Sequence, residues 1–308
     1  MEHSGEISRS DVKLHRERAG QGQGLDAGLP RMLLEVLAFT GYGMWMLLGL
    51  ALALGIYSSG RGESLVPLSL GAAFVTLGLL VACLRLPVVP DWHGWRLGRG
   101  SRPTREAMMA LLAYLPMLAV AALARGDNDF WATRLAGGAL TLASLATLIY
   151  TAHGFGARRA PDLSQATSYL PVSRVVSACY AGGLWLWVCL VAQDDQTTMG
   201  STLYWVLSLL ALALLLGGVE GMRWRALQGQ GLESNAKPRR ILSLSPARFL
   251  AAVLIYALPC VALLATGFEC APLWLSVIAA VACGLGKTLE QRLYELALAA
   301  RSRDIGLV

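Results

Sequence analysis

Eight apolar runs of about twenty residues each limit what this chain can fold into more than any other feature. A run of that length spans the roughly 30 Å hydrocarbon core of a bilayer as an α-helix, in which every backbone amide finds its partner inside the helix. The composition agrees, because 55% of the residues are hydrophobic and only 15% are charged. The predicted spans are 32–57, 64–83, 104–124, 135–153, 172–191, 199–219, 247–266 and 272 to about 296. The sequence therefore predicts an all-α integral membrane protein with eight transmembrane helices in one bundle.

The two ends of the chain differ from the apolar middle. Residues 1–30 mix acids and bases and contain neither an apolar core nor a small-residue cleavage site, so we predict a flexible tail and not a signal peptide. The transmembrane domain is predicted over 31–300, and 301–308 form a short end.

The basic residues predict the orientation of the spans. All but three of the 26 lysines and arginines fall in the two ends of the chain and in or beside the loops that follow the second, fourth and sixth spans. The opposite loops hold only Arg61, Arg125 and Arg134. Because basic residues concentrate on the cytoplasmic side, both termini are predicted to be cytoplasmic. The basic loops are assigned to orientation and lipid contact, and no nucleic-acid partner is predicted.

Cysteine and histidine patterns bear on which cofactors the chain binds. The six cysteines lack the short spacings of cluster sites, so no iron–sulfur cluster is expected in this chain. Of four histidines only His153 lies near the end of a predicted span, which disfavours a haem held by two facing histidines.

Glu106 stands at the start of the third predicted span, with Thr104 placed to cap the helix and Pro103 just outside it. One interpretation is purely structural, because the helix macrodipole favours a carboxylate in the first turn by about 0.3 to 1 kcal/mol. The surrounding residues favour a second interpretation, a binding site.

Arg85, Trp92, His93 and Arg105 flank Glu106 in the sequence and would form an amphipathic pocket at the bilayer surface. Such a pocket suits a molecule with a polar head and a lipid tail, and a quinol is one. Its oxidation releases two electrons and two protons, so a carboxylate or an imidazole must accept protons. Glu106 and His93 are the candidate proton acceptors.

A second polar cluster lies in the last span, within "GKTLEQRLYELALAARSRD". Lys287 and Glu290 are three residues apart on one helix face, as are Arg292 and Glu295. Charged residues inside a membrane indicate function by default, but long side chains near a helix end can also reach water. Both interpretations, a site and a helix-end anchor, stay open.

Four stretches of the chain resemble the DMSO reductase anchor subunit family. They are "CLRLPVVPDWHGWRLGRGSRPTREAMMALL", "LIYTAHGFGARRAPDL", "SPARFLAAVLIYALP" and "LEQRLYE". The first resembles the family's connection between its second and third helices, with Ser101 to Glu106 fitting the helix start. The second resembles the end of the fourth helix, which contains Tyr150. The likeness covers nearly the whole chain and implies the same eight helices.

The resemblance implies a membrane anchor that oxidises menaquinol in anaerobic respiration, in a bacterial cytoplasmic (inner) membrane. Its expected partners are the lipid membrane, an iron–sulfur electron-transfer subunit and a molybdopterin catalytic subunit, which the charge distribution places on the cytoplasmic side. Glu106 matches the family's quinol-site glutamate, whereas Arg85 stands where the family has a histidine. Since arginine keeps its proton, the base would be Glu106 or His93. The resemblance adds Tyr150 to Arg85, Trp92 and Arg105 as residues that would hold the quinol.

Two other classes of function remain as alternatives. A small-solute transporter or permease would show repeated halves and polar groups near the bilayer midplane, whereas this sequence places its charges toward the span ends. A plain assembly or scaffold protein would bind partners without depending on a quinone.

Overall fold

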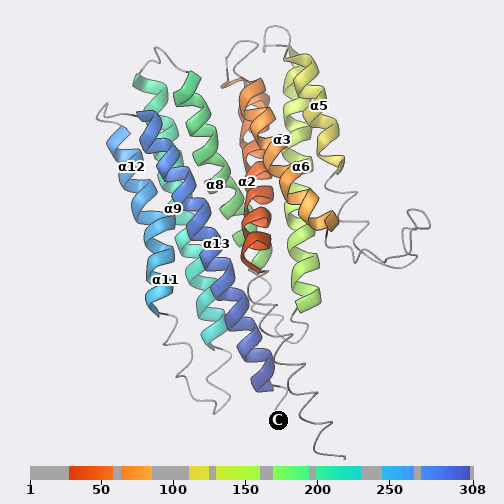
Figure 1. Ribbon diagram of the computed structural model, residues 1–308. Coiled ribbons are helices and arrows are strands. Elements are labelled where there is room, and N and C mark those ends of the chain that lie inside the picture. The colour runs from red at the N-terminus through yellow and green to blue at the C-terminus, as the bar shows by residue number, and fades with distance from the viewer. Residues whose placement is uncertain are drawn as a thin grey trace, which may run out of the picture.

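The computed structural model describes residues 28–57, 64–84, 111–124, 130–159, 169–193, 199–229, 245–266 and 272–305. Within these ranges every regular element is a helix (Figure 1). The helices are α2 (Gly28–Ala53), α3 (Leu65–Leu84), α5 (Tyr114–Leu123), α6 (Trp131–Arg159), α8 (Leu170–Gln193), α9 (Met199–Gly229), α11 (Ser245–Ala252), η1 (Val253–Ala257), α12 (Leu258–Thr266) and α13 (Pro272–Ile305).

Six of these helical segments are long and apolar enough to cross a membrane, and α3 and α5 contribute shorter apolar stretches. The predicted all-helical fold is therefore confirmed for the described residues, and the six long apolar helices are compatible with the predicted membrane bundle, while the count of eight spans stays a prediction. The outward faces are strongly apolar: Leu214 is 80% exposed, and Phe249 and Trp274 are similarly uncovered. Such faces fit contact with lipid, because a water-soluble bundle would carry polar residues there.

Helix α9 is longer than its apolar run suggests. The apolar run predicts that the sixth span ends at Val219, but α9 continues to Gly229, because Glu, Met, Arg, Ala and Leu all favour the helix. Glu220 and Arg223 consequently belong to a helix and not to a loop.

Helix α2 occupies the middle of the bundle and packs against α3, α6, α8 and α13 (Figure 1). The closest approach is between α2 and α8. A Cβ atom built on Gly43 would overlap the carbonyl of Ala178, and one built on Gly182 would overlap the backbone of Gly43 and Met44. Only glycine allows two helix backbones to lie this near each other.

The part of the core around α2 is apolar and rich in aromatic rings. Trp45 is fully buried, and its indole Nε1 donates a hydrogen bond to the carbonyl of Leu68 at 3.1 Å. The rings of Tyr42 and Tyr114 meet Trp45 edge-on, with centroid separations of 5.8 and 5.1 Å. The indole thus fastens α3 and α5 to α2.

A second core joins α8, α9, η1, α12 and α13. Its centre holds Tyr180, whose hydroxyl donates to the carbonyl of Ile255 at 3.1 Å. Ile255 lies in η1, a single π-helical turn inside the helix that runs from Ser245 to Thr266. A Cβ atom on Gly286 would meet Leu254 and Ile255 at 2.7 to 3.1 Å, so the glycine lets α13 lie directly against this turn.

Candidate functional site

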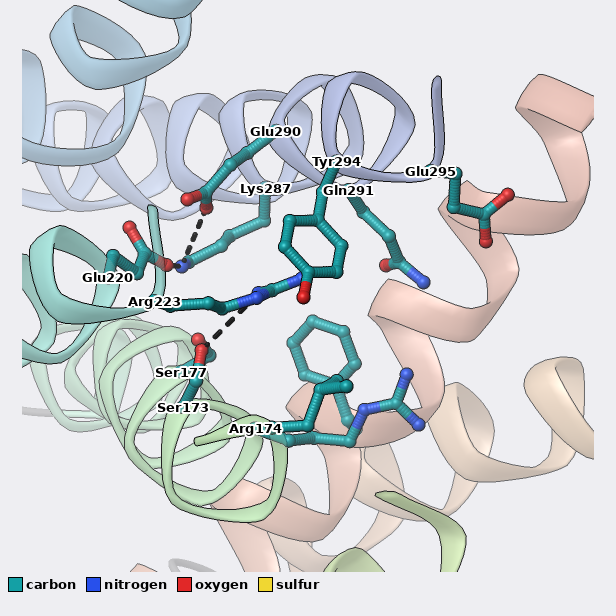
Figure 2. A pocket seen from close by; sticks show the side chains of 12 residues that line it. Ser173, Arg174, Ser177, Glu220, Arg223, Lys287, Glu290, Gln291, Tyr294 and Glu295 are labelled. Carbon is teal, nitrogen blue, oxygen red and sulfur yellow. Dashed lines mark hydrogen bonds and ion pairs between the residues drawn. The ribbon is translucent and has the colours of Figure 1, made fainter. Parts of the chain in front are cut away.

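A polar pocket lies between α2, α8, α9 and α13, toward the end of the bundle where α2 and α8 begin (Figure 2). Its volume is about 50 Å³, room for a few water molecules. The lining residues are Phe39, Leu170, Ser173, Arg174, Ser177, Glu220, Arg223, Lys287, Glu290, Gln291, Tyr294 and Glu295. Among these residues are three cations and three acids, so the pocket gathers charge that the rest of the bundle interior avoids.

The innermost charge is the ammonium of Lys287, which lies between two carboxylates (Figure 2). Its Nζ donates to Oε1 of Glu220 on α9 and to Oε2 of Glu290 on its own helix, the latter at 3.1 Å. Lys287 is 4% exposed and Glu220 is 5% exposed. Because an isolated charge is very costly to bury, both partners are needed to hold the ammonium here.

The π-helical turn supplies a fourth member of this cluster. Tyr256 in η1 donates its phenol hydroxyl to Oε2 of Glu220, so the two oxygens of this carboxylate have different donors. Such turns are frequent at functional sites because the extra residue redirects a side chain. The close contact of Gly286 with the turn brings Lys287 and Tyr256 to the same carboxylate. We call Glu220, Tyr256, Lys287 and Glu290 the charged cluster.

A stack of cations and aromatic rings extends the pocket wall toward the end of the bundle. The guanidinium carbon of Arg223 lies 3.3 Å from the ring centroid of Tyr294. The rings of Tyr294 and Trp224 meet edge-on, with their centroids 5.8 Å apart. On Trp224 lies the guanidinium of Arg248, whose carbon is 3.9 Å from the ring centroid. These contacts fix Arg223 without a carboxylate, since its described hydrogen bond is a 3.5 Å contact with the hydroxyl of Ser173.

Two buried donors in the pocket wall have no hydrogen-bond partner among the described residues. They are Nε of Arg223 and Nε2 of Gln291. A buried donor without an acceptor costs about 1 to 3 kcal/mol. Water in the pocket would satisfy both, because the site is polar and large enough to hold it.

An ion pair between α2 and α8 borders the pocket. Nη2 of Arg174 donates to Oε1 of Glu35 at 2.5 Å, and the two side chains are 12% and 26% exposed. This pair is thus more accessible than the charged cluster.

The charged cluster lies within the membrane-crossing part of its helices. Lys287 is 14 residues into the apolar segment Leu273–Ala297, or about 21 Å along the helix axis. Glu220 is six residues before the end of the segment Leu203–Ala226, or about 9 Å. Ionisable residues at such depths mark functional sites by default.

Most of the residues predicted for a quinol site cannot be placed. Arg85, Trp92, His93, Arg105 and Glu106 lie outside the described residues. Tyr150 is in α6, is 37% exposed and does not line the pocket. The quinol site predicted at Glu106 therefore stays a prediction.

The predicted pairing of Lys287 with Glu290 is confirmed. Lys287 does not reach outward past the helix end, however, because its ammonium turns inward to Glu220. The sequence analysis missed Glu220 and Tyr256. A signal was present in the sequence: a lysine inside an apolar span needs a carboxylate from another helix, and Glu220 directly follows the sixth apolar run. The pairing of Arg292 with Glu295 stays a prediction.

Comparisons with protein-family models, with curated proteins and with solved structures give no match to this chain. Among the described side chains, no group of three or more His, Cys, Asp and Glu residues could hold a metal ion. What the structure presents is a set of paired acids and bases around a pocket, an arrangement that can hold and release protons.

Proposed function

We propose that this chain is the membrane anchor subunit of a DMSO reductase-type complex in a bacterial inner membrane, with eight spans and both termini in the cytoplasm. It would oxidise menaquinol and pass the electrons to an iron–sulfur subunit, which supplies a molybdopterin catalytic subunit. The sequence resemblance suggests this class. The structural observation that supports it is the charged cluster beside a polar pocket, because Glu220 and Lys287 are the fully buried charged residues in the described part of the chain.

Quinol oxidation needs groups that accept protons at the membrane. Each quinol gives up two electrons and two protons, and the electrons alone go on to the partner subunit. Carboxylates inside a membrane are costly and are kept where protons or ions move. Glu220 and Glu290 meet this requirement in the described part of the chain, and Glu106 and His93 are predicted to meet it at the quinol itself.

The end of α3 and the pocket lie at the same end of the bundle. A Cβ atom on Gly78 in α3 would meet the carbonyl of Leu34 in α2 at 2.9 Å, so the late part of α3 lies beside the early part of α2. The early part of α2 also carries Glu35 and Phe39, which border the pocket. The helix α3 ends at Leu84, and Arg85, the first residue predicted for the quinol site, is the next residue in the sequence.

The second candidate is a small-solute transporter, and one observation favours it. The sequence suggested that charges gather at the span ends, but Lys287 and Glu220 are buried within membrane-crossing segments. Ion-coupled transporters place paired charges in this way. The two candidates differ in their need for partners, because an anchor subunit should do little alone.

The test is purification from the native membrane in a mild detergent, followed by measurement of molybdenum, iron and oxidation of a menaquinol analogue. We expect both metals to co-purify and the complex to oxidise the quinol. Glu106→Gln should assemble normally and lose most quinol oxidation, while Glu269→Gln, in a loop predicted on the opposite side, should retain it. A chain that purifies without redox partners but drives solute uptake into liposomes would be a transporter.

A further inference from the structure

We propose that the charged cluster binds one exchangeable proton, shared between Glu220 and Glu290 and connected to bulk solvent through water in the pocket. The inference rests on the proposed function only for the source of this proton, which would be the quinol. The binding site itself follows from the geometry of four side chains and one cavity.

The first step of the argument is the charge balance. One ammonium, that of Lys287, lies between two carboxylates, so the fully ionised cluster by itself carries a net charge of one negative unit. Burying such a charge is unfavourable, and two carboxylates that share one site resist being ionised together. Adding one proton makes the cluster neutral, and Lys287 keeps an ionised partner. This site can therefore bind and release a proton without leaving a buried cation unpaired.

The second step concerns the groups that surround the carboxylates. Tyr256 donates to Glu220 and is neutral, so it positions the carboxylate without changing the charge. Two further cations lie near the cluster: Arg223 of α9, whose guanidinium lies on the ring of Tyr294 (Figure 2), and Arg248 of α11, which acts on Glu290 through space. Among the described residues neither forms an ion pair with Glu220 or Glu290, so neither takes the place of a proton on a carboxylate oxygen. The charged and polar groups near the cluster and its pocket come from six elements. They are Ser173, Arg174 and Ser177 of α8 with Glu35 of α2 as the partner of Arg174, Arg223 of α9, Arg248 of α11, Tyr256 of η1, and Lys287, Glu290, Gln291, Tyr294 and Glu295 of α13.

The third step is the route to water. The pocket holds about 50 Å³, which accommodates a few waters, and each buried water needs two to four polar partners. The open donors of Arg223 and Gln291 and the hydroxyls of Ser173 and Ser177 provide such partners. Glu290 connects the buried charged cluster with the pocket, because it binds Lys287, lines the pocket and is 12% exposed.

The proton step balances as follows. A quinol releases two protons and two electrons, and the electrons leave to the iron–sulfur subunit. The two protons pass through the cluster one after the other: each in turn forms an O–H bond on a carboxylate oxygen of Glu220 or Glu290, and Lys287 stays bound to the other carboxylate. The O–H bond then breaks as a pocket water takes the proton toward the end of the bundle where α2 and α8 begin, the side predicted to be cytoplasmic.

Infrared difference spectroscopy of the purified full-length protein tests this without any redox partner. As the pH falls, the wild type should gain the carbonyl stretch of one protonated carboxylic acid, and the band should shift promptly in D2O. Glu220→Gln and Glu290→Gln should each remove or move this band. Glu269→Gln, which changes a carboxylate in a loop predicted on the opposite side of the membrane, should leave it in place. Circular dichroism and gel filtration would show that each variant folds.

Three results would overturn the proposal: no such band in the wild type, a band that persists when Glu220 and Glu290 are both replaced, or a band that does not exchange with D2O. Failure of the proposed function gives a different result. The band would then titrate as expected, while the wild-type complex would oxidise no quinol.

Discussion

The two cores of this bundle differ in how much charge they bury. Around α2 the helices meet through glycines and aromatic rings, and Gly43 and Gly182 bring two backbones into direct contact. Around η1 and α13 the same apolar framework encloses Lys287 and two carboxylates. A buried ion pair often contributes less stability than well-packed apolar residues of the same size. In the described part of the chain, the first core buries no charge fully, since the Arg174–Glu35 pair of α8 and α2 is partly exposed, so the fully buried charge of the second core points to a chemical role.

The strongest test of the contrast is removal of the ammonium. Lys287→Met should lower the free energy of unfolding by about 3 to 5 kcal/mol, because Glu220 and Glu290 remain buried without a cation. Unfolding of the detergent-solubilised protein by circular dichroism measures this loss. Adding Glu220→Gln to Lys287→Met should recover part of the stability. A loss below about 1 kcal/mol would mean that the cluster is hydrated enough to dispense with the ammonium.

The glycine contact of the first core gives the next largest effect. Gly182→Val should lower the free energy of unfolding by about 3 kcal/mol, because the valine side chain would clash with the backbone of α2. Gly218→Val is the matched control, since a Cβ atom at Gly218 has no neighbour within 4 Å. Equal stability of the two variants would contradict the close approach of α2 and α8.

A tyrosine in the second core tests the bond to the carboxylate. Tyr256→Phe removes the donor to Glu220 and should cost about 1.5 kcal/mol, as expected for a hydrogen bond to a charged group. Tyr204→Phe, at a side chain that is 76% exposed, should change the stability little. If both changes cost the same, the phenol does not hold Glu220.

A tyrosine-to-phenylalanine change in the first core should have the smallest effect on the free energy of unfolding. Tyr114 shares a 2.8 Å hydrogen bond with Thr76 between two neutral hydroxyls. Tyr114→Phe should cost about 0.6 kcal/mol, because neutral side-chain bonds within membranes are weak and the edge contact with Trp45 remains. A cost as large as that of Tyr256→Phe would remove the difference between the two cores.

The sequence predicts the helices well because run length and hydropathy determine them, and the six long apolar helices lie where the runs are. The site was harder to predict. The spacing of Lys287 and Glu290 indicates a pair within one helix, but spacing cannot show that α9 supplies the main partner. Glu220 follows the last apolar residue of its run and therefore resembles a loop residue in the sequence, although the helix continues past it.

The basic residues also show that a sequence does not reveal which helices bring their charges together. Arg174, Arg223 and Lys287 count toward the charge bias that predicts the orientation, yet the structure places all three in the wall of the pocket. Their contribution to orientation and their place in the site are not exclusive. Hydropathy identifies where a charge interrupts an apolar pattern, whereas only packing shows which helices turn their charges toward one another.

Quinol oxidation by the Glu220→Gln complex, measured at equal amounts of folded protein, tests the central claim most directly. The account predicts that turnover falls by about 100-fold, the usual contribution of a positioned proton acceptor, while Glu269→Gln retains normal turnover. Unchanged turnover in Glu220→Gln, with the complex assembled and folded, would show that the cluster is structural and would contradict the account.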